Sequence, residues 1–172
     1  HIQRMAAYVY EIALSFGLSP GAADLYKLAA PLHDIGKLGV RDHVLLKPTQ
    51  LEEDEVELIR MHTTIGAEIL AHPRTELMQL AYEMARGHHE RWDGLGYPDG
   101  LSGEEIPLPA RICAVADVFE ALTGKRVYRE TLMAAEEAKA EILAGSGTRF
   151  DPRVVQAFLE AYDRIVGSGE RG

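Results

Sequence analysis

Side chains of the types that bind metal ions lie on faces of predicted helices that are otherwise apolar. They are His33, Asp34, His62, His88, His89 and Asp117. Asp117 falls in a stretch, 108–123, that is apolar almost all round, where an uncompensated buried carboxylate costs several kcal/mol. Four predicted helices thus each present His or Asp inward, and helices that converge in this way build di-metal sites in bundles.

A cluster of imidazole and carboxylate ligands without thiolate favours iron, manganese, cobalt, nickel or reactive zinc over a structural zinc site. Asp34 or Asp117 can bridge two ions with its two oxygens, which an imidazole cannot do. Two ions about 3.5–4 Å apart suit in-line attack on a phosphoester. Taken singly, each residue is better explained as a hydrogen-bonded core or surface group. The set as a whole favours a di-metal phosphohydrolase.

Apolar residues at spacings of three and four predict the helices that must position these side chains. The predicted helices span 2–16, 20–32, 108–123, 134–144 and 152–166, and two more follow Thr49 and Thr75 and have their apolar faces at 56–69 and 77–88. Ser19 with Pro20, and Asp151 with Pro152, are typical helix starts, and Thr49 to Glu52 has the spacing of a capping box. A short strand at 44–46 is the one alternative to helix. We expect an all-α fold: a single bundle of about seven helices with a long Gly/Pro-rich loop at 90–107.

Length and composition limit the class of protein. A chain of 172 residues with 47% hydrophobic residues suits one globular domain, expected at 1–166 and followed by a flexible polar tail at 167–172. The formal charge of −9 gives no general attraction to duplex nucleic acid or anionic membranes. No apolar run approaches the roughly 18–20 residues that cross a bilayer, and the single Cys113 cannot form an internal disulfide. We therefore expect a cytoplasmic domain without a membrane segment. Because a helical pattern is already under way at His1, this domain is expected to be cut from a longer protein.

Five short motifs in order resemble those of HD-GYP domains, a branch of the HD phosphohydrolases that hydrolyse the bacterial second messenger cyclic di-GMP. The resemblance covers nearly the whole chain. The motifs are His33-Asp34-Ile35-Gly36-Lys37, His88-His89-Glu90, Gly96-Tyr97-Pro98, Asp117-Val118-Phe119-Glu120-Ala121-Leu122-Thr123 and Phe150-Asp151-Pro152. An HD pair alone is common by chance, whereas the ordered set is highly specific.

The resemblance implies roles for individual residues. Metal ligands are implied at His1, His33, Asp34, His62, His88, His89 and Asp117, which would hold two divalent ions, iron or manganese before zinc, cobalt or nickel. Asp34 and Lys37 would be catalytic, with Lys37 reaching the attacking water or the scissile phosphate. Members with a third ion carry a Glu about one turn before the position of His1; because the sequence begins at His1, that Glu either lies in an upstream segment or is missing, and a third ion stays an open alternative.

Substrate-binding roles follow from the same resemblance. Tyr97 and Pro98 would line the substrate site or dock diguanylate cyclase (GGDEF) domains. Arg126 and Arg129 match positions that hold the substrate phosphates, and their spacing of three places both on one face of a helical turn. Val127 replaces the usual proline between them.

The expected function is metal-dependent hydrolysis of cyclic di-GMP, or a related cyclic dinucleotide, to linear pGpG and further to GMP. The domain would be the output of a bacterial signalling protein with a sensor or receiver upstream, and a homodimer is compatible with this role. Two alternatives stay open. One is a module that binds a cyclic dinucleotide or a diguanylate cyclase without catalysis, and the other is an HD phosphohydrolase acting on another nucleotide.

Overall fold

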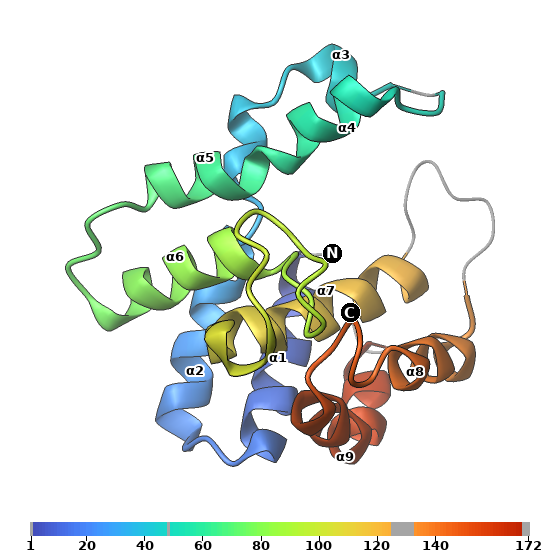
Figure 1. The fold of residues 1–172 in the computed structure, drawn as a ribbon. Coiled ribbons are helices and arrows are strands. Elements are labelled where there is room, and N and C mark those ends of the chain that lie inside the picture. Colours follow the sequence, from blue (N-terminus) through green and yellow to red (C-terminus); the bar gives the residue numbers. More distant parts are fainter. Residues whose placement is uncertain (1, 48, 125–132, 170–172) are drawn as a thin grey trace.

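The computed structural model describes residues 2–47, 49–124 and 133–169, and this part of the chain folds into helices without a β-strand (Figure 1). The expected all-α class is confirmed. None of the described helices has both the length and the apolar character needed to cross a membrane. In chain order the elements are α1 (Ile2–Phe16), α2 (Pro20–Ala29), η1 (Ala30–Leu32), η2 (Ile35–Gly39), α3 (Asp42–Leu45), α4 (Glu53–Arg60), α5 (His62–Ile69), α6 (Glu76–Gly87), η3 (Gly103–Glu105), α7 (Leu108–Thr123), α8 (Ala135–Ala144) and α9 (Pro152–Gly169).

Helix α7 lies at the centre of the core, as its nearly continuous apolar sequence predicts. It packs against α1, α6, α8 and α9, and most of its residues are buried. Phe119 of α7 meets the ring of Tyr8 from α1 edge-on at 5.5 Å and that of Phe158 from α9 at 5.1 Å. Asp117 therefore stands on a helix that other helices hold in place on several sides.

Two predicted helix starts are confirmed by their hydrogen bonds. The Ser19 hydroxyl accepts from the backbone N–H of Ala22 at 3.3 Å and begins α2. The Asp151 carboxylate accepts from the backbone N–H of Arg153 at 2.8 Å and begins α9. Helix α9 continues to Gly169, three residues beyond the expected end of the domain at 166.

The helix predicted at 56–69 is wrong as a single element, because the structure breaks it at Met61 into α4 and α5. The hydroxyls of Thr63 and Thr64 donate to the carbonyls of Arg60 and Met61, both at 2.9 Å, and so compete with backbone donors at the break. The capping box lies later than predicted, with the Glu55 carboxylate accepting from the Glu52 N–H. The suggested strand at 44–46 is also wrong, since that segment belongs mainly to α3.

The helix predicted at 20–32 ends at Ala29, and the chain continues through two short 3₁₀ turns, η1 and η2. Pro31 has no N–H to continue the α-helical pattern, and Gly36 and Gly39 follow closely. Leu28, which its spacing of three and four from Leu25 and Leu32 predicts on the apolar face of this helix, is instead 60% exposed. The pair His33-Asp34 thus lies between two tight turns rather than on a regular helix.

Candidate metal centre and adjoining cavity

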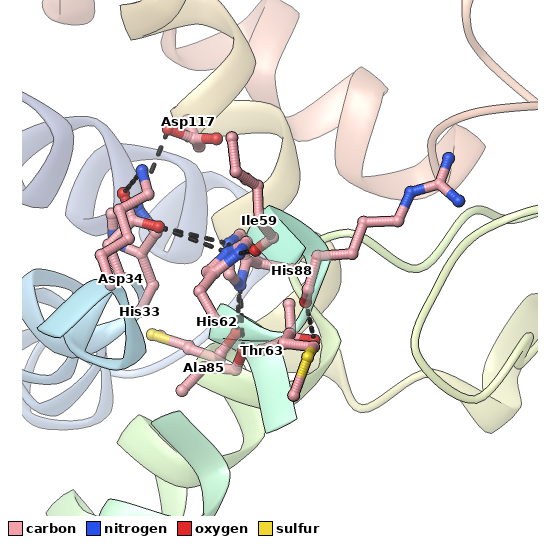
Figure 2. Close-up of polar contacts among 12 residues, drawn as sticks. His33, Asp34, Ile59, His62, Thr63, Ala85, His88 and Asp117 are labelled. Atoms are coloured by element: carbon pink, nitrogen blue, oxygen red, sulfur yellow. Dashed lines mark hydrogen bonds and ion pairs between the residues drawn. The ribbon is translucent and has the colours of Figure 1, made fainter. Parts of the chain in front are cut away.

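Four separate segments bring the predicted ligands together. His33 and Asp34 come from the turn between η1 and η2, His62 is the first residue of α5, and His88 follows the last turn of α6. Asp117 approaches from α7. Figure 2 shows these side chains pointing toward one shared space.

Asp34 lies at the middle of this group, with its two oxygens facing different partners. Its Oδ2 is 3.3 Å from Nε2 of His33, while its Oδ1 is 3.5 Å from Nε2 of His62 and 3.8 Å from Nε2 of His88. Asp117 contributes an Oδ1 atom 3.8 Å from Nε2 of His33. This is the arrangement of a carboxylate that can bridge two cations, one on each side.

Backbone carbonyls determine which nitrogen of each buried histidine faces the centre. The Nδ1–H of His33 donates to Ala30 at 2.8 Å, that of His62 donates to Ile59 at 2.6 Å, and that of His88 donates to Met84 at 2.9 Å. A carbonyl oxygen only accepts, so Nδ1 carries the hydrogen and Nε2 carries a lone pair. Hydrogen bonds of this kind orient metal-binding histidines.

These lone pairs need a cation. The Nε2 atoms of His62 and His88 lie only 3.3 Å apart, although neither has a hydrogen to donate to the other. Nε2 of His33 is buried 3.3 Å from Oδ2 of Asp34, where two acceptor atoms would meet unless a proton or a cation lies between them. Burial without a partner is costly for such an atom. Divalent ions between these nitrogens and the Asp34 oxygens would satisfy all of them, so the residues present fit a metal centre.

A divalent ion binds neutral imidazole and ionised carboxylate, and the pKa shifts of Asp34, His62, His88 and His89 favour these forms, whereas His33 would have to lose a proton when an ion binds. Burial lowers the pKa of His62, lowers that of His88 well below its usual value, and lowers that of His89 to about 3. Burial opposes ionisation of Asp34, but hydrogen bonds and charges from His33 and Lys37 outweigh it and lower the pKa of this carboxyl. Burial also lowers the pKa of His33, yet contact with Asp34 outweighs this effect and raises it.

The described residues contain two groups of three potential metal ligands, and within each group all ligand atoms lie within 4.8 Å of one another. One group is His62, His88 and His89, and the other is His33, Asp34 and His88. The predicted ligands from 33 to 117 therefore meet at one place. Asp117 joins through its approach to His33. The remaining predicted ligand, His1, lies outside the described residues.

Of the predicted catalytic and substrate-binding residues, some lie at the ligand cluster and others do not. The Lys37 ammonium is ion-paired with Oδ2 of Asp34. Tyr97 stacks on the ring of His89, with 4.8 Å between ring centroids and 23° between planes, and burial raises its pKa to about 12. Pro98, joined to Tyr97 by a cis peptide bond, is half-buried and does not line the cavity beside the centre. Arg126 and Arg129 lie outside the described residues.

A cavity of about 250 Å³ opens beside the metal centre. Its lining includes His88, His89, Tyr97, Asp117 and the three arginines Arg60, Arg91 and Arg149. Local pattern did not single out these three arginines, because each lies in a different segment and only the fold brings them together. The cavity adds positive charge next to the ligand cluster in an acidic chain.

Glu90 has a role that its place in the motif does not reveal. It is buried, its Oε1 accepts from the N–H of Asp99 at 2.7 Å, and its Oε2 accepts from the N–H of Leu101 at 3.1 Å. Burial raises the pKa of this carboxyl. On the outside of the same loop, Arg86 of α6 forms two bonds of 2.7 Å to the Asp99 carboxylate. The loop carrying Tyr97 is therefore tied down at its far side.

Comparisons with known proteins agree with this geometry. The family model described as "HD domain" matches residues 1–154. A probable cyclic di-GMP phosphodiesterase from Vibrio cholerae is 53% identical over 148 residues, which is 83% of this chain and 33% of that protein. A 3'3'-cGAMP-specific phosphodiesterase 2 from the same organism is 42% identical over 166 residues, or 96% of this chain and 32% of that protein. A cyclic di-GMP phosphodiesterase from Thermotoga maritima is 45% identical over 166 residues, which is 96% of this chain and 45% of that protein.

Solved structures show the same fold. A cyclic GMP-AMP specific phosphodiesterase from V. cholerae superposes with a TM-score of 0.71 at 23% identity, covering 96% of this chain and 45% of that one. An HDG"Y"P protein from Bdellovibrio bacteriovorus superposes with a TM-score of 0.69 at 18% identity, covering 95% of this chain and 53% of that one. The chain spans between about a third and a half of the length of these relatives. It belongs to the HD domain family and carries the HD-GYP motifs.

Proposed function

We propose that this domain is a metal-dependent phosphodiesterase that opens cyclic di-GMP to linear pGpG and carries the product on to GMP. The observation that carries the proposal is the position of Asp34, whose two oxygens face histidine nitrogens on opposite sides. The similarity to enzymes named cyclic di-GMP phosphodiesterases supports the substrate class. In the longer protein the domain would be the output of an upstream sensor or receiver.

The chain's own residues would divide the work. His33, Asp34 and Asp117 would hold one divalent ion, and Asp34, His62, His88 and His89 the other, with His1 as a further ligand. Such ions polarise a phosphoryl group and generate a nucleophile from water at neutral pH. Iron and manganese suit this set of imidazoles and carboxylates without thiolate. Backbone hydrogen bonds behind the histidines hold the ligand nitrogens in place without reorganisation.

Lys37 would act next to the metal ligands. Its ammonium contacts Asp34, so it would bring a positive charge close to the non-bridging oxygens of the scissile phosphate or to the attacking water. Tyr97 would form the wall of the substrate site, stacked on His89 and held by the loop that Glu90 anchors. Arg126 and Arg129 would hold substrate phosphates. The outer surface of the same loop, with Tyr97 and Pro98, would dock diguanylate cyclase domains.

A second candidate substrate is 3'3'-cGAMP, because a relative specific for it is 42% identical over 96% of this chain. Both candidates carry two phosphodiesters and differ in one base, so one experiment can separate them. Purified domain reconstituted with Mn²⁺ or Fe²⁺ should contain at least two ions per chain and should hydrolyse cyclic di-GMP faster than 3'3'-cGAMP. Fewer than one ion per chain would contradict the metal centre. Full metal content with dinucleotide binding and no turnover would favour the non-catalytic module instead.

A further inference from the structure

The three arginines that line the cavity beside the metal centre differ in what neutralises them. Arg60 pairs with Glu57 at 2.6 Å and lies over the Tyr97 ring at 5.1 Å. Arg91 forms two bonds, of 3.0 and 2.6 Å, to the Asp93 carboxylate. Arg149 is different: within residues 2–47, 49–124 and 133–169, no carboxylate lies within ion-pair distance of its guanidinium.

The surroundings of Arg149 favour an anion. Its guanidinium lies 5.2 Å from the centroid of the Phe150 ring, on an apolar surface. Arg149 is exposed to solvent as a whole residue, but the atoms packed around its guanidinium and then the positive charge of Arg91 lower its pKa, and the Asp117 charge only partly offsets this. Arginine nevertheless stays charged at neutral pH, so three guanidinium groups line the same cavity, and among the described residues only that of Arg149 has no carboxylate within ion-pair distance. A bound phosphate would relieve that repulsion, and the planar fork of arginine suits its oxygens.

Arg149 also lies between the cavity beside the metal centre and a second cavity. Together with Val118 and Phe150 it lines a second cavity of about 520 Å³, bounded by α7, α8 and the turn between α8 and α9. The first cavity, about 250 Å³, is smaller than the roughly 300–1,000 Å³ typical of ligand pockets. A cyclic dinucleotide with one phosphate at the metal centre would extend beyond this cavity, and the residues that line both cavities give it a path past Arg149, where a cation could meet its second phosphate.

We propose that Arg149 binds the second, non-scissile phosphodiester of the cyclic dinucleotide at the boundary between the two cavities. This inference rests on the proposed function for the substrate class. Arg149 reaches the cavity from the turn before α9, independently of the segment that holds Arg126 and Arg129. It is a binding residue for the part of the substrate that does not react.

The test compares Arg149→Ala and Arg149→Lys with the wild type, and with Arg153→Ala as the matched control. Arg153 is four residues along, exposed, and paired with Glu104 at 2.7 Å away from the cavity. Calorimetric Kd and steady-state KM and kcat would be measured for cyclic di-GMP and 3'3'-cGAMP, and metal content would be measured for every variant. Bis(p-nitrophenyl) phosphate serves as a diester without a second phosphate.

Arg149→Ala should raise Kd and KM about tenfold for both cyclic dinucleotides. This factor is the lower end of the range for losing a hydrogen bond to a charged group, because Arg149 is accessible to solvent. Lysine should restore part of the affinity, kcat and metal content should change little, and the loss should be several-fold smaller for the small diester. Arg153→Ala should match the wild type.

Three results would overturn the assignment. If affinity falls for cyclic di-GMP alone, Arg149 contacts guanine and not the phosphate. If affinity falls equally for all three substrates, or metal content falls, Arg149 supports the metal centre. An unchanged Kd would mean that it does not touch the ligand. If the wild type binds the dinucleotides without hydrolysing them, the proposed activity fails, while the Kd comparison still decides the role of Arg149.

Discussion

The α-carbon of Gly36 lies directly against the backbone carbonyl of His62, so closely that a β-carbon on residue 36 would overlap that oxygen and the nearby N–H of Gly66. This contact seats α5 on the η2 turn, which is one of the largest packing contacts in the described fold. The two segments carry Asp34 and His62, whose ligand atoms lie 3.5 Å apart. The glycine at position 36 therefore sets the spacing of two of the proposed metal ligands.

Gly36→Ala should separate α5 from η2 and disrupt the metal centre. The blocking atoms belong to backbone, so we expect a loss of about 3 kcal/mol or more in the free energy of unfolding, at the upper end for overpacking. Metal content should fall in parallel. Gly21→Ala is the matched control: nothing lies within 4 Å of the added carbon, and alanine in α2 should stabilise by about 0.4–1 kcal/mol. Denaturant unfolding and elemental analysis check both, and normal metal content in Gly36→Ala would contradict the argument.

Asp34→Ala should abolish hydrolysis and lower metal content together. Without this carboxylate, the histidine nitrogens on its two sides lose their shared partner, and two divalent ions held there would lack the negative charge between them. The control Asp24→Ala removes an exposed carboxylate of α2 and should leave both properties unchanged. Metal analysis and turnover are measured on the same preparations. Near-normal turnover in Asp34→Ala would show that Asp34 has a structural role only.

Lys37→Ala should reduce the rate and keep the metal ions. Lys37 contacts Asp34 from outside the cluster of ligand nitrogens, and its ammonium would stabilise negative charge on the reacting phosphate. Removing one such donor costs about 100-fold or more in kcat. Lys27→Ala, on the exposed face of α2, is the control and should behave as the wild type. Loss of metal in Lys37→Ala would contradict a role on the substrate side.

Glu90→Gln should loosen the loop that carries Tyr97 without removing metal ligands. The carboxylate accepts from two loop N–H groups, whereas an amide offers one oxygen and turns an NH₂ group toward the other donor. An unsatisfied buried donor costs about 1–3 kcal/mol, so kcat/KM on the dinucleotide should fall about 5- to 100-fold if the loop shifts to relieve it. Glu68→Gln, exposed on α5, should have no effect. A variant with normal kinetics would show that the loop position does not depend on Glu90.

Asp151→Ala should destabilise the fold. This buried carboxylate begins α9 and also accepts from the Arg111 guanidinium at 2.7 Å, so alanine removes a helix cap and leaves a partly buried arginine without its partner. The expected cost is about 3–5 kcal/mol, or roughly 6–20 °C in Tm. Asp163→Ala, exposed on the same helix, should shift Tm by about 2 °C or less, since surface substitutions rarely exceed ~0.5 kcal/mol. Equal shifts in the two variants would contradict the role of Asp151.

The local sequence pattern was sufficient to predict structure wherever a segment's own residues determine its conformation. The bounds of α7 follow from its apolar residues, and the starts of α2 and α9 follow from Ser19 and Asp151, because helix caps act on backbone groups only two or three residues away. The chemical types of the metal ligands were also evident, since His or Asp on an apolar face stands out within a single turn.

Only the tertiary structure decided how those ligands are used. The break at Met61 turns His62 toward Asp34, the Gly36 contact sets their spacing, and backbone carbonyls behind the rings choose Nε2 as the nitrogen that faces the centre. The buried Glu90 and the cavity that holds Arg149 likewise depend on segments far apart in the chain. Periodicity reports which face of a helix is buried, but not which atoms of another segment will meet it, because that depends on packing between elements.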